Sequence, residues 1–337
     1  MTRPYVHLDP LLSAAQADAI VRLCERFGPY GTYGAEAARE EQGRTRYAPG
    51  VAQRYDAAVN FVRSGGRFGR REAPEVLAAR TNYFRETYFY GQAVVDGLEA
   101  FLHHEGLRDA ARKVHGRPLV VPSIVYANLL LPGQELAVHT DVPEFRGADR
   151  TRLPQWLLVV MLHSGLFDAW RRPIATGIAY FQECRGGALA FYPDGPDAPP
   201  TTIPARHNTA VVLDTDTVFH GVDRVRSDAS VPPFRRGMQL VFDAGAWRLF
   251  EGDETLARYR WEEIRFSVSW KAYCYEDEAD RQRAERHEDD LGLPRILDVL
   301  EADLRRRGRL EGPRPPEDPF ALRLIEEYVR FPRPAAA

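Results

Sequence analysis

Apolar residues recur at helical spacing in the first part of the chain. Ser13-Ala-Ala-Gln16 has the form of a helix capping box, in which the two end side chains cap the first turn. The helix predicted after it has its apolar stripe at Ala17, Ile20, Cys24 and Phe27. A second helical region is predicted from about residue 75 to residue 114. The segment 29–72, rich in Gly, Arg and Tyr, is expected to be irregular.

From Pro118 the pattern changes to short apolar and β-branched runs separated by turn residues. The run from Leu119 to Leu131 ends at Pro132-Gly133, which is typical of a strand followed by a turn. Further strands are predicted at 156–162, 177–181, 188–192, 210–213, 218–222 and 238–242. Many short strands with Gly and Pro between them are typical of an antiparallel sandwich or barrel.

Beyond about Phe250 the chain is rich in charge and is predicted to be helical again. One apolar stripe at helical spacing contains Ile296, Val299, Leu300 and Leu304. A second apolar stripe follows the proline-rich stretch 313–319. The chain is therefore expected to form a single domain, with a β-rich core between two helical flanks.

The composition narrows the possible functions without selecting one. The chain has 337 residues, 44% hydrophobic and 28% charged, with a formal net charge of −3. This charge gives no general attraction to nucleic acid or to an anionic membrane, so neither partner is expected. The sequence lacks both a run of ~18 apolar residues and the apolar core of a signal peptide. Its three cysteines are widely spaced, which favours a reducing, cytoplasmic location. The oligomeric state is not indicated.

One predicted strand runs directly into a histidine and a carboxylate two positions apart. In Leu136-Ala-Val-His-Thr-Asp141, the side chains of His139 and Asp141 can share a face, because strand side chains alternate. Polar groups at the end of a buried strand need partners. His-x-Asp also occurs at His7 and His287, but the first precedes a predicted helix and the second lies in a charged run. The middle pair is therefore the candidate metal site.

The third ligand is expected from a later strand. His220 ends the segment Asp214-Thr-Asp-Thr-Val-Phe-His and lies 81 positions after His139. Two histidines and one carboxylate with open positions form the facial triad of non-haem Fe(II) oxygenases. We therefore predict that His139, Asp141 and His220 bind one iron ion and form the catalytic centre.

An arginine after the last ligand is the candidate for binding a carboxylate. Arg236 opens the strand predicted after His220 and shares the apolar face of Met238, Leu240 and Phe242. On a face that points into a barrel, a guanidinium needs a carboxylate and can bind it with two hydrogen bonds. The 16 positions from His220 to Arg236 include a predicted loop, so Arg235 and Arg226 stay open as alternatives.

Together these features resemble the Fe(II)/2-oxoglutarate-dependent dioxygenases, whose core is a double-stranded β-helix, or jelly roll. The family pattern is His-x-Asp, a Gly-Gly strand, a distal histidine and a basic residue on the last strand. Here these parts are His139-Thr-Asp141, Gly186-Gly187, His220 and Arg236. The resemblance implies an α+β fold with a cupin-like jelly-roll core at 118–245. The helical flank would then be 1–117 and the helical C-terminal extension 246–337.

The resemblance also implies the cofactors and the reaction. 2-Oxoglutarate would chelate Fe(II) through its keto-acid end and bind Arg236 through its far carboxylate, and O2 would be the second co-substrate. Succinate and carbon dioxide would be released while a C–H bond of the substrate is oxidised. Asn128 and Tyr180 lie on strands that face the cofactor in similar folds, and are its further candidate contacts. A carboxylate at position 141 favours hydroxylation, desaturation or ring closure over halogenation.

Three functions are consistent with the sequence. The first is hydroxylation of a small molecule, such as an amino acid or a natural-product intermediate. The second is hydroxylation of a peptide or protein side chain, as in prolyl hydroxylases, and the third is a non-oxidative, cupin-like metal-binding protein. The connection 142–174 and the C-terminal helices are expected to cover the mouth of the barrel, because an oxidising centre must be shielded from water. The substrate itself is not indicated.

Overall fold

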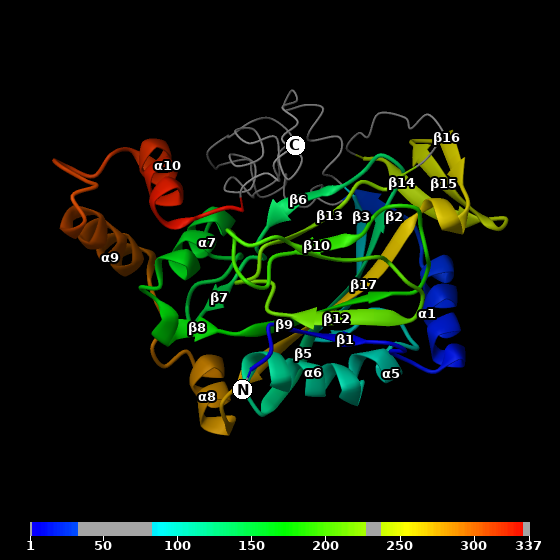
Figure 1. Ribbon diagram of the computed structural model, residues 1–337, viewed down its shortest axis with the longest axis horizontal. Helices are drawn as coiled ribbons and strands as arrows, with labels where there is room; N and C mark the ends of the chain where they lie inside the picture. Colours follow the sequence, from blue (N-terminus) through cyan, green and yellow to red (C-terminus); the bar gives the residue numbers. More distant parts are fainter. Residues whose placement is uncertain (1, 33–82, 227–236, 333–337) are drawn as a thin grey trace.

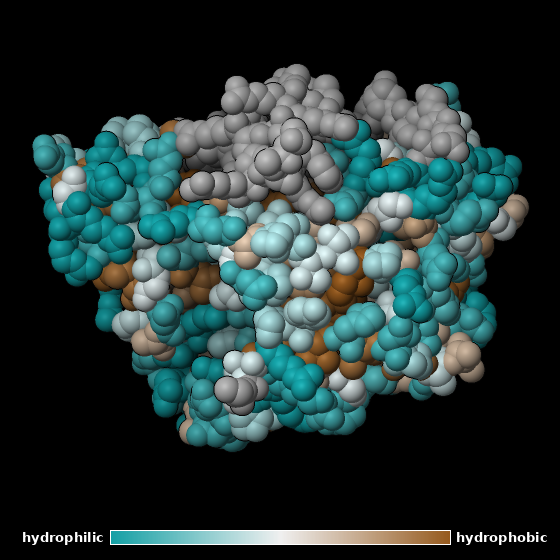
Figure 2. Space-filling view, in the orientation of Figure 1, coloured by the Kyte–Doolittle hydropathy of each residue, from teal (hydrophilic) through white to brown (hydrophobic). Residues whose placement is uncertain are grey.

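The computed structural model describes residues 2–32, 83–226 and 237–332 (Figure 1). Helices flank the antiparallel sheets, and the N-terminal helix α1 (Ala14–Arg26) begins at the predicted capping box of Ser13. Hydrophilic side chains cover most of the face seen in Figure 2, where hydrophobic ones form small separate patches. Among the described residues, no helix is long and apolar enough to span a membrane.

Eight strands form a jelly roll of two facing sheets. The larger sheet contains, as neighbours, β12 (Thr209–Leu213), β9 (Ile174–Tyr180), β17 (Arg265–Tyr275) and β5 (Leu119–Leu130). The smaller sheet has the order β11 (Thr201–Ile203), β10 (Leu189–Phe191), β13 (His220–Val222) and β6 (Leu136–His139). The chain passes back and forth between these two sheets, as in a double-stranded β-helix. The predicted α+β fold with a jelly-roll core is therefore confirmed.

The interior of the jelly roll is apolar on one side and polar on the other. The apolar side lies along β9, β10 and β12 and consists of Ile178, Tyr180, Leu189, Phe191, Ala205, Val211 and Leu213. The polar side lies along β17, where alternate residues share a face. Its inward residues are Arg265, Ser267, Ser269 and Lys271. This polar side gives charged groups a place inside an otherwise apolar fold.

Helices cover the outer face of the larger sheet. α1, α5 (Glu99–Leu102) and α6 (Glu105–His115) share one apolar cluster with the outward side chains of β17, such as Val268 and Trp270. The Trp270 indole donates a hydrogen bond of 2.9 Å to the carbonyl of Leu102. Burial of this outward face fixes the register of β17, so its opposite face must point into the barrel.

The larger sheet continues past the jelly roll at both ends. β1 (Tyr5–Leu8) pairs with β12 at one end. Beyond β5, the order is β3 (Phe84–Tyr90), β2 (Tyr30–Thr32), β14 (Gln239–Asp243), β15 (Ala246–Glu251) and β16 (Glu254–Tyr259), and β4 (Gln92–Ala93) pairs with β3. The residues between β13 and β17 thus include a three-stranded addition to the outer sheet.

The long connection after Asp141 packs against the C-terminal extension. The connection holds β7 (Glu144–Phe145), α7 (Gln155–Ser164) and β8 (Arg171–Arg172), and the extension holds α8 (Glu278–Glu285), α9 (Leu293–Arg306) and α10 (Glu317–Tyr328). Both segments share an apolar cluster with Val138 of β6 and Phe219 beside β13. They therefore lie next to the strands that carry the predicted ligands (Figure 1). That they cover the barrel mouth stays a prediction.

Three predicted elements are wrong. Residues 84–90, placed in a helix, form strand β3, and 156–162, predicted as a strand, lie in helix α7. Helix α7 buries six consecutive residues from Leu157 to Leu162, and an apolar run of this length fits a buried helix or strand equally well. The stretch after Phe250 is also not yet helical, because β16 and β17 precede the C-terminal helices. The strands of the jelly roll consequently reach Tyr275.

Candidate functional site

The structure brings the three predicted metal ligands together at one end of the smaller sheet. His139 ends β6 and His220 begins β13, and these two residues are direct cross-strand partners. Asp141 follows β6, and its Oδ1 atom lies 3.7 Å from the Nε2 atoms of both histidines. One ligand atom from each of the three residues lies within 4.8 Å of the others. Two imidazole nitrogens and one carboxylate oxygen therefore converge on one point.

Backbone hydrogen bonds fix which nitrogen of each histidine faces this point. The Nδ1 atom of His139 lies 2.7 Å from the carbonyl of Ala137, and that of His220 lies 3.0 Å from the carbonyl of Val218. Because a carbonyl can only accept, each Nδ1 carries the proton. Each Nε2 atom then keeps a free lone pair, as in histidines that bind metals in proteins.

The charge states of the ligands also suit a metal. Burial and the adjacent His139 lower the pKa of His220 to about 4, so its imidazole is neutral at physiological pH. Burial by itself would raise the pKa of Asp141, but the Lys271 ammonium and the two histidines hold it well below its usual value. Two imidazoles with an ionised carboxylate are the donor set of 2-His-1-carboxylate iron sites. The residues present therefore fit an Fe(II) ion.

A buried arginine that sequence reasoning missed lies on the polar side of the barrel. Arg265 begins β17 and is 2% exposed. Its guanidinium donates to the carbonyl of Gly187 at 2.7 Å, to the Ser267 hydroxyl at 2.9 Å and to the Tyr180 hydroxyl at 3.3 Å. No carboxylate in the described part of the chain forms an ion pair with it. A buried guanidinium without a counter-charge is costly, so this geometry fits a bound anion.

The Gly-Gly pair of the sequence pattern makes room for this arginine. Gly187 has a φ of +63°, and a Cβ atom there would lie 2.9 Å from the Cδ atom of Arg265. At Gly186, φ is +76°, and a Cβ atom would clash with the carbonyl oxygen of Arg224. Both positions thus need glycine for conformation and for space.

Both predicted cofactor contacts lie close to Arg265. Tyr180 is fully buried, and its hydroxyl accepts a hydrogen bond from Arg265. Burial raises the pKa of Tyr180, so the phenol keeps its proton and can itself donate to a carboxylate. Asn128 pairs with Ser267 across β5 and β17, and its Oδ1 atom is buried without a hydrogen-bond partner among the described residues.

Of the three arginines considered from the sequence, Arg226 is the one that lies in the described part of the chain. Arg236 and Arg235 lie outside the described residues, and Arg226 is exposed. The strand that Arg236 was expected to open is β14, which pairs with β2 and β15 and is not the last strand of the barrel. That position belongs to β17. The assignment of Arg236 to the carboxylate stays a prediction, now with Arg265 as its competitor.

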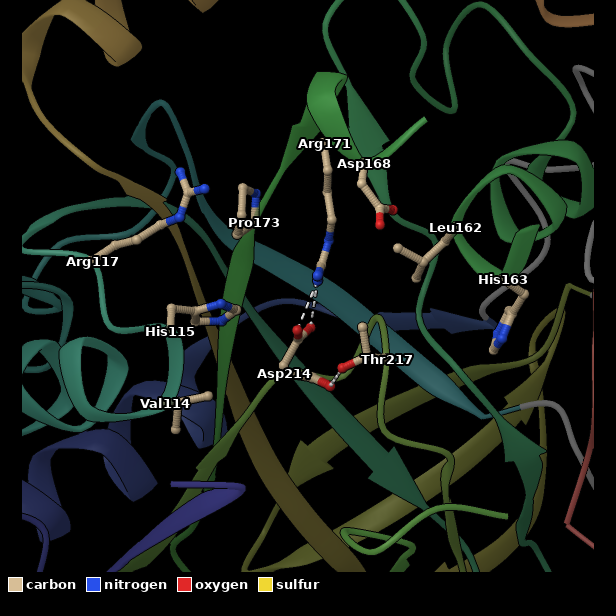
Figure 3. A pocket seen from close by; sticks show the side chains of 10 residues that line it. All are labelled: Val114, His115, Arg117, Leu162, His163, Asp168, Arg171, Pro173, Asp214 and Thr217. Carbon is tan, nitrogen blue, oxygen red and sulfur yellow. Dashed lines mark hydrogen bonds and ion pairs between the residues drawn. The ribbon is translucent and has the colours of Figure 1, made fainter. Parts of the chain in front are cut away.

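A separate cavity of about 620 Å³ lies between α6, α7 and the loop that follows β12 (Figure 3). Its walls include His115, His163 and an Arg171–Asp214 ion pair with bonds of 2.7 and 2.9 Å. None of the three metal ligands lines it. The cavity therefore borders the loop before His220 and is not the metal site itself.

Comparisons with known proteins give no close relative. No family profile matches the sequence, and no curated protein matches it. Among solved structures, a Pseudomonas putida prolyl-4-hydroxylase is 14% identical with a TM-score of 0.40, over 81% of this chain and 93% of that one. The carbocyclase SnoK from nogalamycin biosynthesis is 11% identical with a TM-score of 0.40, over 81% and 80%. HygX from Streptomyces hygroscopicus, solved with nickel and 2-oxoglutarate, is 9% identical with a TM-score of 0.39, over 81% and 83%.

Proposed function

We propose that this protein is a non-haem Fe(II)- and 2-oxoglutarate-dependent oxygenase that hydroxylates a C–H bond of a small molecule. The main support for this proposal is that two histidine Nε2 atoms and one carboxylate oxygen converge, with Asp141 Oδ1 3.7 Å from each nitrogen. This centre lies in a barrel that also holds Arg265, a buried cation without a carboxylate partner among the described residues.

The metal ligands and Arg265 would have different roles in this reaction. His139, Asp141 and His220 would hold iron, which together with 2-oxoglutarate and O2 supplies the oxidising chemistry and yields succinate and carbon dioxide. Arg265, with the hydroxyls of Ser267 and Tyr180, would bind the far carboxylate of 2-oxoglutarate. A guanidinium and two hydroxyl donors can satisfy both carboxylate oxygens in a buried site.

The apolar side of the barrel gives the site its dry wall. Phe191 is the cross-strand partner of His220, and both it and Leu189 are at most 1% exposed. An apolar wall beside the metal excludes water, which strengthens the charge interactions in the site and limits side reactions. This is the environment that an oxidation of an unactivated C–H bond requires.

A turnover assay distinguishes small-molecule from peptide substrates. A prolyl-type hydroxylase of peptides would use the same three ligands and the same arginine. We would incubate the purified protein with Fe(II), 2-oxoglutarate and ascorbate in air, and follow succinate by mass spectrometry. Free amino acids, natural-product intermediates and prolyl peptides would be supplied in parallel.

Succinate stimulated by a small molecule, with a product heavier by one oxygen atom, is the expected result. Stimulation by prolyl peptides alone would replace the small-molecule proposal with the peptide one. If no succinate formed under any condition, the third hypothesis would be favoured, that of a non-oxidative, cupin-like metal-binding protein.

A further inference from the structure

Lys271 has an unusual place in this chain. The sequence contains two lysines against 43 arginines, and Lys271 is the one inside the barrel, with its side chain 13% exposed. It lies on the polar face of β17, six residues after Arg265. An ammonium is a compact point charge, whereas a guanidinium is a broad planar fork. In a chain that otherwise uses arginine, a lysine here indicates that the site needs a small cation.

The ammonium of Lys271 contacts the carboxylate of the metal centre on its far oxygen. Its Nζ atom lies 2.7 Å from Oδ2 of Asp141, while Oδ1 of the same carboxylate faces the two histidines. The two oxygens of Asp141 therefore have different partners. One is directed to the metal position and the other is held by a cation.

A closed ring of hydrogen bonds fixes this arrangement. Lys271 also donates to Thr176 Oγ1 at 3.0 Å, and that hydroxyl lies 2.7 Å from the hydroxyl of Thr215. The carbonyl of Thr215 accepts from the backbone N–H of Asp141 at 2.7 Å. Asp141 is thus held at its backbone and at Oδ2 by the same ring, and both threonines are at most 2% exposed. A ring on rigid, buried elements can set the orientation of a ligand.

We propose that Lys271 is a positioning residue that keeps Asp141 a one-oxygen ligand, and so keeps a coordination position free for the co-substrate. This inference rests on the proposed function. An octahedral ion with three protein ligands has room for a chelating 2-oxo acid and for O2. If Oδ2 of Asp141 also bound the metal, it would take one of these positions. The Lys271 ammonium prevents this by occupying Oδ2.

Cobalt(II) binding to the metal-free protein tests this role without turnover. Co(II) would be titrated into the wild type, Lys271→Met and Lys113→Met, and its visible absorption recorded before and after 2-oxoglutarate is added anaerobically. Methionine keeps the length of the side chain without its charge, and Lys113 is an exposed lysine of α6 that serves as the matched control.

In Lys271→Met we expect Co(II) to bind with an altered spectrum, because the carboxylate coordinates differently. We expect the affinity of the Co(II) protein for 2-oxoglutarate to fall by ~10–100-fold, the usual size of an outer-shell effect. Lys113→Met should match the wild type in both. A wild-type spectrum and affinity in folded Lys271→Met would overturn the inference. A wild type that binds no Co(II) would instead overturn the proposed function.

A second variant keeps the inference testable if Lys271→Met does not fold. Thr176→Val keeps the lysine but removes the hydroxyl that holds it, at nearly the same volume. We expect the same spectral change in a weaker form, with a loss of 2-oxoglutarate affinity in the same direction. An unchanged spectrum and affinity in Thr176→Val would then overturn the inference.

Discussion

Replacing Arg265 with methionine should abolish most of the affinity for 2-oxoglutarate while leaving the metal site intact. The side chain is 2% exposed, and its three hydrogen bonds run to Gly187, Ser267 and Tyr180. Methionine fills much of the same space but carries no charge. The three hydrogen bonds of Arg265 do not involve the metal ligands, so Fe(II) affinity should stay close to that of the wild type.

The expected magnitude follows from the kind of bond that is lost. A hydrogen bond to a charged group contributes about 1.5–3 kcal/mol, which corresponds to ~10–150-fold in the dissociation constant of 2-oxoglutarate. Folding should also be weakened, because the carbonyl and two hydroxyls lose their donor. Each buried group left without a partner costs about 1–3 kcal/mol. The free energy of unfolding of the variant must therefore be measured beside its affinity.

The assay is anaerobic calorimetric titration of 2-oxoglutarate into Fe(II)-loaded protein, with Arg236→Ala and Arg235→Ala run in parallel. We expect a large loss of 2-oxoglutarate affinity for Arg265→Met and little change for the other two variants. The sequence alone favoured Arg236, and its variant should lose ~10–150-fold if that assignment is right. A folded Arg265→Met with wild-type affinity would show that Arg265 does not bind the carboxylate of 2-oxoglutarate.

Further predictions concern stability and turnover. The metal-free protein should lose up to about 3 kcal/mol of stability as pH falls from about 6.5 to about 4, because burial lowers the pKa of His220 in the fold and protonation then favours the unfolded chain. Urea unfolding should show this slope, and His220→Gln should flatten it; a wild type that grows more stable over this range would contradict the assignment. Arg146→Met should cost about 1.5–3 kcal/mol of unfolding free energy, because the 8% exposed guanidinium binds Asp289 at 2.6 and 2.9 Å. In the control Arg206→Met, which loses an exposed ion pair, the cost should be below about 1 kcal/mol, and equal costs would count against the burial argument. Without substrate, the Fe(II) protein should release succinate slowly in air, and Asp141→Ala should release none above background by mass spectrometry; equal release from both would count against a metal role for this carboxylate.

The metal centre could be predicted from the sequence because two of its three ligands are close together in the chain. His139 and Asp141 are two positions apart at the end of an apolar strand, and strand alternation places both on one face. His220 begins a later apolar strand, β13. Strand geometry accounts for the His139–Asp141 pair, and the antiparallel pairing of β6 with β13 brings His220 beside His139.

Arg265 was not predicted from the sequence because it lies farther from His220 than the family pattern suggests. The residues between β13 and β17 carry the strands β14, β15 and β16, so the arginine comes 45 positions after His220. A local signal did exist. From Arg265 to Cys274 polar or charged residues alternate with apolar ones almost without a break, which is the pattern of a strand with one polar face. Because the chain beyond Phe250 is rich in charged residues, this segment was predicted to be helical instead.

The helix and strand errors have a related cause. Helix α7 is apolar on all sides, so it lacks the periodicity that separates a helix from a strand. Strand β3 is held by pairing with β5 and β2, partners that are distant in sequence and that no local pattern reveals. Tertiary contacts of this kind decide β-structure more than intrinsic preference does.

The most direct test of the central claim is the visible absorption that a chelating 2-oxo acid gives when it binds Fe(II) in a protein. Fe(II) and 2-oxoglutarate would be added anaerobically, singly and together, to the wild type and to His139→Ala and His220→Ala. We expect an absorption band that needs both additions, saturates at one iron per chain and is absent from both variants. A wild type without the band, or a variant that retains it at full strength, would contradict the claim that these residues hold an iron centre for 2-oxoglutarate.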